Sequence, residues 1–65
     1  MSYPKLRGRI REKYGTQEAF AVAMGIHPAT LSAKLQGRVD WSLQEMKRAA
    51  ELLELTVEET PAYFF

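Results

Sequence analysis

Apolar residues recur at helical spacing along most of the chain, and no segment alternates apolar and polar residues over the length of a strand. Leu6 and Ile10 lie four residues apart in the first such segment, which predicts a helix from about Pro4 to Lys13. Gly15 marks its end, and proline suits the first turn because its missing N–H would be unpaired there anyway. The whole pattern predicts an all-α protein of four helices followed by a short fifth turn.

A second and a third helix are expected on either side of a very short connection. Thr16 is a good N-cap for the second helix, and Gly25 ends that helix because glycine tolerates the left-handed conformation. Pro28 belongs at the first position of the third helix, which makes His27 its cap. Because only a tight turn separates them, the two helices are expected to cross steeply, as in a helix-turn-helix.

The third helix has a predicted inner side and a predicted outer side. Leu31 and Leu35 are expected to pin it to the core, and Ile26 pairs with Leu31 in a hydrophobic staple before Gly37 ends the helix. At 100° per residue, the opposite side is unusually small and uncharged. Its members are Ala29, Thr30, Ser32, Ala33 and Gln36. Small polar and methyl-bearing side chains suit a surface that lies close to base edges in a major groove.

The fourth helix has the clearest start in the chain. Ser42 and Glu45 have the spacing of a capping box, and Trp41 precedes them as one end of a second staple. Apolar residues then follow at spacings of three, four and three, which predicts a core-facing stripe of Leu43, Met46, Ala50 and Leu53. Thr56 and Glu59 have the spacing of another capping box, but Pro61 is expected to allow only about a turn before the chain leaves the helix.

Composition limits the chemistry available to this chain. With 65 residues it is expected to form one domain over residues 1–65, with a small core. It has no cysteine and one histidine, His27, so we expect no disulfide, no metal site and no cofactor, and no enzymatic activity. No apolar run approaches the ~20 residues of a membrane span and no signal peptide is evident, so a cytoplasmic protein without membrane contact is expected.

Charge is distributed unevenly although the formal net charge is only +1. Residues 1–38 carry seven lysines and arginines against two acidic residues, whereas residues 39–65 carry two against six. This asymmetry suggests a basic end facing a polyanion and an acidic end facing away. The basic run of the first helix can equally be a solvated surface.

The segment Thr16-Gln17-Glu18-Ala19-Phe20-Ala21-Val22-Ala23-Met24-Gly25-Ile26, followed by Thr30-Leu31-Ser32, resembles the lambda-repressor-like helix-turn-helix family. That family includes phage repressors and Cro proteins. The start Lys5-Leu6-Arg7-Gly8-Arg9-Ile10, Trp41 and the ending Pro61-Ala62-Tyr63-Phe64-Phe65 further resemble short phage-encoded members found in Gram-positive hosts. The resemblance covers about residues 5–60 and places the helix-turn-helix proper at residues 16–37.

This resemblance implies a set of DNA contacts. The opening of the third helix would meet bases in the major groove through His27, Pro28, Ala29, Ser32 and Ala33. Phosphate contacts would come from the first turn of the second helix and from basic residues around the motif, namely Gln17, Arg9, Arg11, Lys34 and Arg38. Relatives often carry long polar readers where this chain has proline and alanines, so shape-assisted rather than strong direct readout is expected.

Two functions remain open at this point. The first is a transcriptional regulator of Cro or repressor type that binds a pseudo-palindromic operator in double-stranded DNA as a homodimer. The alternative is a protein-interaction module on the same fold, such as an antirepressor or modulator that binds a larger repressor. It is suggested by the nearly neutral charge and the smooth outer side of the third helix. The aromatic tail of Tyr63, Phe64 and Phe65 could fold back over the core or form a dimer interface.

Overall fold

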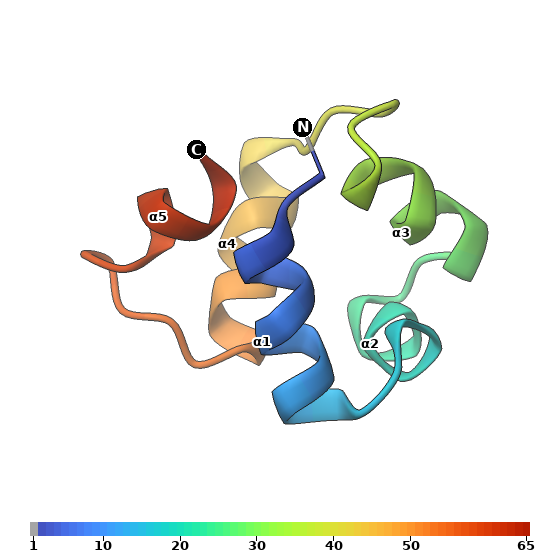
Figure 1. The fold of residues 1–65 in the computed structure, drawn as a ribbon, viewed down its shortest axis with the longest axis horizontal. Helices are drawn as coiled ribbons and strands as arrows, with labels where there is room; N and C mark the ends of the chain where they lie inside the picture. The colour runs from blue at the N-terminus through green and yellow to red at the C-terminus, as the bar shows by residue number, and fades with distance from the viewer. Residues whose placement is uncertain (1) are drawn as a thin grey trace.

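The computed structural model describes residues 2–65, and within this range the chain forms five α-helices and no strand. The helices are α1 (Pro4–Tyr14), α2 (Gln17–Met24), α3 (Pro28–Leu35), α4 (Leu43–Leu52) and α5 (Thr60–Phe64). In Figure 1, α1 crosses in front of α4, with α2 and α3 on one side and α5 on the other. The predicted all-α class is confirmed, and so is the order of its elements.

The core lies where the inner faces of α1, α2 and α3 meet the second half of α4. Its largest fully buried side chains are Phe20, Leu6, Ile10, Leu31, Leu35 and Leu53. Burying a side chain of this size contributes about 1.5–3 kcal/mol of transfer free energy, and together they must offset the chain entropy of a very small domain. Within the described range, no helix has the length and apolarity needed to cross a membrane.

The helix starts follow the local sequence signals. The hydroxyl of Thr16 accepts a hydrogen bond from the backbone N–H of Ala19 at 3.1 Å. At the start of α4 the capping box is complete: the N–H of Glu45 donates to the Ser42 hydroxyl at 3.1 Å, and the N–H of Ser42 donates to the Glu45 carboxylate at 2.9 Å. Each bond satisfies a backbone donor that the helix itself leaves unpaired.

The core-facing side of α4 differs from the prediction. Ala49 and Leu53 are fully buried, whereas Leu43 is 66% exposed and Met46 and Ala50 are half-buried. Within the predicted stripe, Leu53 is buried and Met46 packs partly against the core, whereas Leu43 does not face the core. The reason is that α4 is apolar on two sides, and helical spacing alone does not show which side meets the other helices.

The C-terminal segment also differs from the prediction. Pro61 lies in the first turn of α5 instead of ending a helix, because its missing N–H costs nothing there. The capping box of Thr56 and Glu59 forms, with bonds of 2.9 and 3.1 Å, one turn before α5 begins. α5 then carries Phe64 onto the core, where its ring meets Trp41 edge-on at a centroid distance of 5.1 Å.

Candidate nucleic-acid interface

The helix-turn-helix is built from α2, α3 and the turn between them. Gly25 adopts the left-handed conformation at φ 76°, which closes α2. The next N–H, that of Ile26, bonds back to the carbonyl of Ala21 at 3.0 Å and fixes the direction in which the chain leaves the helix. Ala21 is itself fully buried, as expected where two helices cross closely.

His27 caps α3 through its ring. Its Nδ1 atom accepts a hydrogen bond from the backbone N–H of Ala29 at 3.2 Å. A neutral imidazole that accepts at Nδ1 carries its proton on Nε2, so the exposed ring still offers one donor to the outside. The two sequence-based roles of His27, helix cap and surface contact, are therefore compatible in one conformation.

We expect His27→Ala to lower the free energy of unfolding by about 1 kcal/mol, because a helix N-terminus loses its side-chain acceptor. His27→Asp should preserve or raise stability, since a carboxylate both caps the helix and interacts well with its dipole. Thermal unfolding measures the difference, which for a domain this small is about 4–8 °C per kcal/mol. Equal melting temperatures for the alanine and aspartate variants would contradict the cap.

The outer side of α3 is smooth and uncharged, as predicted. Ala29, Thr30 and Gln36 are exposed, and Ser32 and Ala33 are half-buried. The amide of Gln36 donates to the Ser32 hydroxyl at 3.2 Å, so the polar side chains of this surface bond partly to each other. Methyl groups therefore make up much of the surface that α3 offers to a partner.

The predicted phosphate contact of Lys34 is wrong, because the structure buries this side chain. It is only 5% exposed, and its ammonium group donates to the Glu45 carboxylate at 2.8 Å and to the carbonyl of Asp40 at 2.9 Å. The same group lies 5.8 Å from the centre of the Trp41 ring, within cation–π range. Because these partners hold Lys34 inside the fold, it is not available to a phosphate.

Several arginines are likewise bound within the molecule, where they hydrogen-bond the carbonyl ends of helices. Arg7 donates to the carbonyl of Leu35 at the end of α3, at 3.1 Å. Arg9 donates to the carbonyl of Leu53 at the end of α4, at 3.0 Å, and pairs with Glu12 at 2.8 Å. Positive charge is favourable at these positions because helix C-termini leave carbonyls unpaired and carry a partial negative charge.

A third arginine repeats this arrangement from α4. Arg48 donates to the carbonyl of Ala23 near the end of α2, at 3.3 Å. The sequence pattern indicates no role for Arg7 or Arg48, and the family resemblance implies a phosphate contact for Arg9. Nothing in local spacing could reveal these bonds, because the donor and acceptor lie 25 to 44 residues apart.

The other predicted phosphate contacts are dispersed. Gln17 is half-buried at the first position of α2, Arg11 is exposed on α1, and Arg38 is exposed in the loop after α3. Lys13 on α1 pairs with Glu54 at 3.5 Å. Near α3, the structure therefore leaves Arg38 as the exposed cation. The phosphate contacts of Gln17, Arg11 and Arg38 stay predictions.

The residues of the aromatic tail differ in their surroundings: some pack on the core, and one is free to form an interface. Phe64 is 4% exposed and packs on the core, and Tyr63 lies under the ammonium group of Lys5 at 5.3 Å. Phe65 is 79% exposed. The tail thus folds back over its own protein up to Phe64, and only the last ring stays available for an interface.

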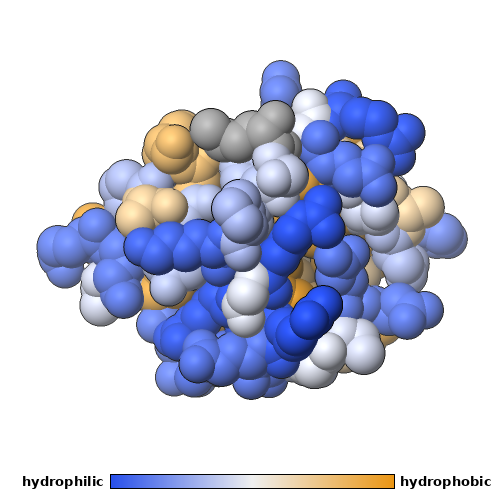
Figure 2. Space-filling model, in the orientation of Figure 1, coloured by the Kyte–Doolittle hydropathy of each residue, from blue (hydrophilic) through white to orange (hydrophobic). Residues whose placement is uncertain are grey.

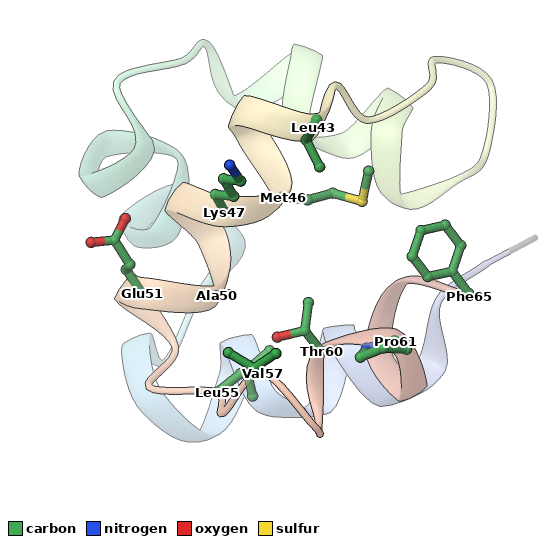
Figure 3. Close-up of a pocket in the computed structure, with 10 residues that line it drawn as sticks. All are labelled: Leu43, Met46, Lys47, Ala50, Glu51, Leu55, Val57, Thr60, Pro61 and Phe65. Carbon is green, nitrogen blue, oxygen red and sulfur yellow. The ribbon is translucent and has the colours of Figure 1, made fainter.

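A groove that the sequence pattern does not predict lies between α4 and the C-terminal segment (Figure 3). Its volume is about 500 Å³. It is lined by Leu43, Met46, Lys47, Ala50, Glu51, Leu55, Val57, Thr60, Pro61 and Phe65. The apolar stripe of α4 was recognised from the sequence but was assigned to the core. Three of the five large exposed hydrophobic residues, Leu43, Val57 and Phe65, belong to this groove.

Comparison with known proteins places this geometry among phage regulators. The model of a family described as protein of unknown function (DUF739) matches residues 1–65. The chain is similar to the solution structure of the modulator of repression (MOR) of the temperate bacteriophage TP901-1 from Lactococcus lactis, with 45% sequence identity and a TM-score of 0.87. The match covers 98% of this chain and 86% of that one. No curated protein sequence matches the chain.

Proposed function

This chain belongs to the family described as protein of unknown function (DUF739), and we propose that it is a phage or prophage regulator that modulates repression by binding a repressor protein. The likeness to a modulator of repression extends over 98% of the chain and carries the proposal. An identity of 45% over that length favours a shared biological role as well as a shared fold.

The distribution of cations supports protein binding over DNA binding. A protein that binds DNA neutralises several phosphates with exposed lysines and arginines, and this term dominates nonspecific affinity. Here the ammonium group of Lys34 and the guanidinium groups of Arg7 and Arg9 bond to other parts of the fold. The basic excess of residues 1–38 therefore overstates the charge that the helix-turn-helix presents outward.

A second candidate function is direct binding of double-stranded DNA through α3. The observation that favours it is the helix-turn-helix itself, in which a tight turn joins α2 to α3 and the outer side of α3 is small and rich in methyl groups. Arg38 and the free Nε2 donor of His27 flank that side. This function requires Ala33 to lie against the bases, whereas the proposed function does not.

The test uses the repressor and operator of the phage or prophage that encodes this chain. We expect the chain alone to leave operator DNA unshifted in a mobility assay at ~50 mM salt, where phosphate contacts are strongest. Calorimetry should detect binding to the purified repressor, and adding the chain should change the repressor–operator band. Ala33→Glu should leave repressor binding intact, with Ala62→Glu as an exposed alanine control on α5.

Opposite results would select the second function. If the chain alone retards operator DNA, if that binding weakens steeply with salt, and if Ala33→Glu abolishes it while Ala62→Glu does not, α3 reads DNA. Absence of any heat or complex with the repressor would overturn the proposed function.

A further inference from the structure

The groove between α4 and the C-terminal segment is a mostly apolar hollow that the other described residues leave open. In Figure 3, Leu43 and Met46 extend from α4 toward the segment that carries Val57, Pro61 and Phe65. Leu43, Val57 and Phe65 are 66%, 84% and 79% exposed. Single exposed hydrophobic residues are ordinary, but a contiguous set around a hollow is typical of an interaction site.

α4 is apolar on two sides, and the core accounts for only one of them. Ala49 and Leu53 are fully buried and face the other helices. A helix that only covers a core usually has polar residues on the remaining surface. Here Leu43 and Ala50 occupy that surface instead, and Met46 lines the groove while it also packs partly against the core. Leu43 is exposed on this second side, so burial in the monomer does not explain its apolar character.

The walls of the groove are held in place by hydrogen bonds and by ring packing. The complete capping box of Ser42 and Glu45 fixes the start of α4. On the opposite wall, the Thr60 hydroxyl donates to the carbonyl of Thr56 at 2.8 Å, and Phe64 anchors α5 on Trp41. A groove formed before binding requires little ordering when a partner arrives.

The shape of the groove suits a helix. α4 has ten residues and is about 15 Å long at 1.5 Å per residue, so its exposed stripe can meet about three turns of a partner. An amphipathic helix that docks in such a groove inserts apolar residues at positions i, i+3 or i+4, and i+7. On the α4 wall, Leu43, Met46 and Ala50 recur at this same helical spacing.

Charge indicates the flanks of that helix. Glu51 lies on the groove wall, Glu58 follows Val57, and both are exposed, against the single cation Lys47. Residues 39–65 as a whole carry six acidic side chains and two basic ones. A partner with basic residues beside its apolar ridge is complementary to this rim. A second copy of the chain would bring one acidic surface against another.

We propose, resting on the proposed function, that this groove binds an amphipathic helix of the repressor, apolar on the inserted side and rich in lysine or arginine on its flanks. The groove thus forms the protein-binding surface of the chain, and it is separate from the outer side of α3. Its anchors are Leu43, Met46, Val57 and Phe65, and Glu51 and Glu58 orient the partner.

The experiment compares two double variants that change the net charge equally. Leu43→Lys with Val57→Lys alters the groove, and Val22→Lys with Val39→Lys alters two exposed valines outside it. All four positions are exposed, and circular dichroism checks that both variants fold. Calorimetry should show about 100-fold weaker repressor binding for the groove variant, because two anchors become charges that repel a basic helix. The control variant should bind within twofold of wild type.

Charge and partner identity are tested separately. Glu51→Gln with Glu58→Gln should slow association severalfold at low salt, and much less at 0.5 M salt. Hydrogen exchange on the complex should protect one repressor segment with apolar residues at helical spacing and basic flanks. Protection of an acidic or non-helical segment would overturn the inference.

The outcomes separate the two proposals. If the wild type fails to bind the repressor, the proposed function fails. If the wild type binds and the groove variant binds equally well, only the groove inference fails. If sedimentation shows that the wild type dimerises and the groove variant does not, the occupant is a second copy and the inference is overturned.

Discussion

Glu45→Ala is expected to lower the free energy of unfolding by about 2–3 kcal/mol, which is a large share of the roughly 3–10 kcal/mol available to a domain of this length. The Glu45 carboxylate accepts from the Lys34 ammonium group at 2.8 Å and from the Ser42 N–H at 2.9 Å. Without it, Lys34 keeps a buried charge that only the Asp40 carbonyl and the Trp41 ring face. We expect a smaller loss of unfolding free energy than for a fully buried ion pair because the Glu45 side chain is 28% exposed. Chemical denaturation measures it.

Two matched variants isolate the cause. Glu59→Ala breaks the other capping box, that of Thr56, which has the same two bonds but no buried lysine, so its effect should be clearly smaller. Lys34→Met removes the buried charge and fills the same space, and the Glu45 carboxylate that remains is 28% exposed and still accepts from the Ser42 N–H, so this variant should cost less than Glu45→Ala. If Glu59→Ala and Glu45→Ala destabilise equally, the capping bond alone explains the effect and the ion pair contributes nothing.

The ion pair also predicts an acid dependence. The hydrogen bond from Lys34, together with that from the Ser42 backbone, holds the pKa of Glu45 below its ordinary value of 4.5. A carboxyl whose pKa is lower in the folded protein contributes stability that is complete above its unfolded pKa and is lost as the pH falls through its folded pKa. Wild-type stability should therefore fall below about pH 4.5, and Glu45→Gln should lack that part of the decline.

Phe64→Ala is expected to cost about 3–5 kcal/mol, the usual range for truncating a buried phenylalanine. The ring is 4% exposed and meets Trp41 at 5.1 Å, and it is the buried residue of α5. Removing it should detach α5 and leave the rest of the domain marginal. Thermal unfolding should show a much lower and broader transition.

The neighbouring ring is the control for that experiment. Phe65→Ala should change stability by less than about 0.5 kcal/mol because this ring is 79% exposed. A similar loss for both variants would mean that the whole aromatic tail packs on the core. A negligible effect of Phe64→Ala would mean that α5 is not part of the cooperative fold.

Much of the fold could be predicted from the sequence because its signals are local. Thr16, His27 and Ser42 each precede a helix by one residue, and each satisfies a backbone donor two or three residues away. Gly25 is required by a left-handed backbone at one position. Such signals need no knowledge of what the helix packs against, so helix starts and the turn agree closely with the prediction.

The features of the fold that the sequence did not predict depend on packing between helices. α4 offers two apolar sides, and the packing of the other helices decides that Ala49, not Ala50, is fully buried. Lys34 reads as a surface residue by type, yet it is buried because Glu45 lies opposite, eleven residues further along the chain. Pro61 is a residue type that usually ends a helix. Here it lies at the second residue of α5, in the first turn, where a helix tolerates proline.

The candidate site shows the same division. The outer side of α3 follows from the position of Leu31 and Leu35 on the inner side, so its smooth character was predicted. The number of cations available near it was not, because Arg7 and Arg9 bond to helix ends far along the chain. Charge counted from a sequence describes the whole chain, whereas recognition depends on the charge that the fold leaves exposed.

Trp41 gives the molecule an optical probe of its own. It is the single tryptophan of the chain, and it touches elements from both ends: Tyr3 at 6.5 Å, Lys34 beneath its ring and Phe64 at 5.1 Å. Its indole nitrogen is buried and has no hydrogen-bond acceptor within residues 2–65. Its fluorescence spectrum should therefore respond to loss of α5, to loss of the lysine charge and to unfolding. One emission signal can follow these separate events without any attached dye.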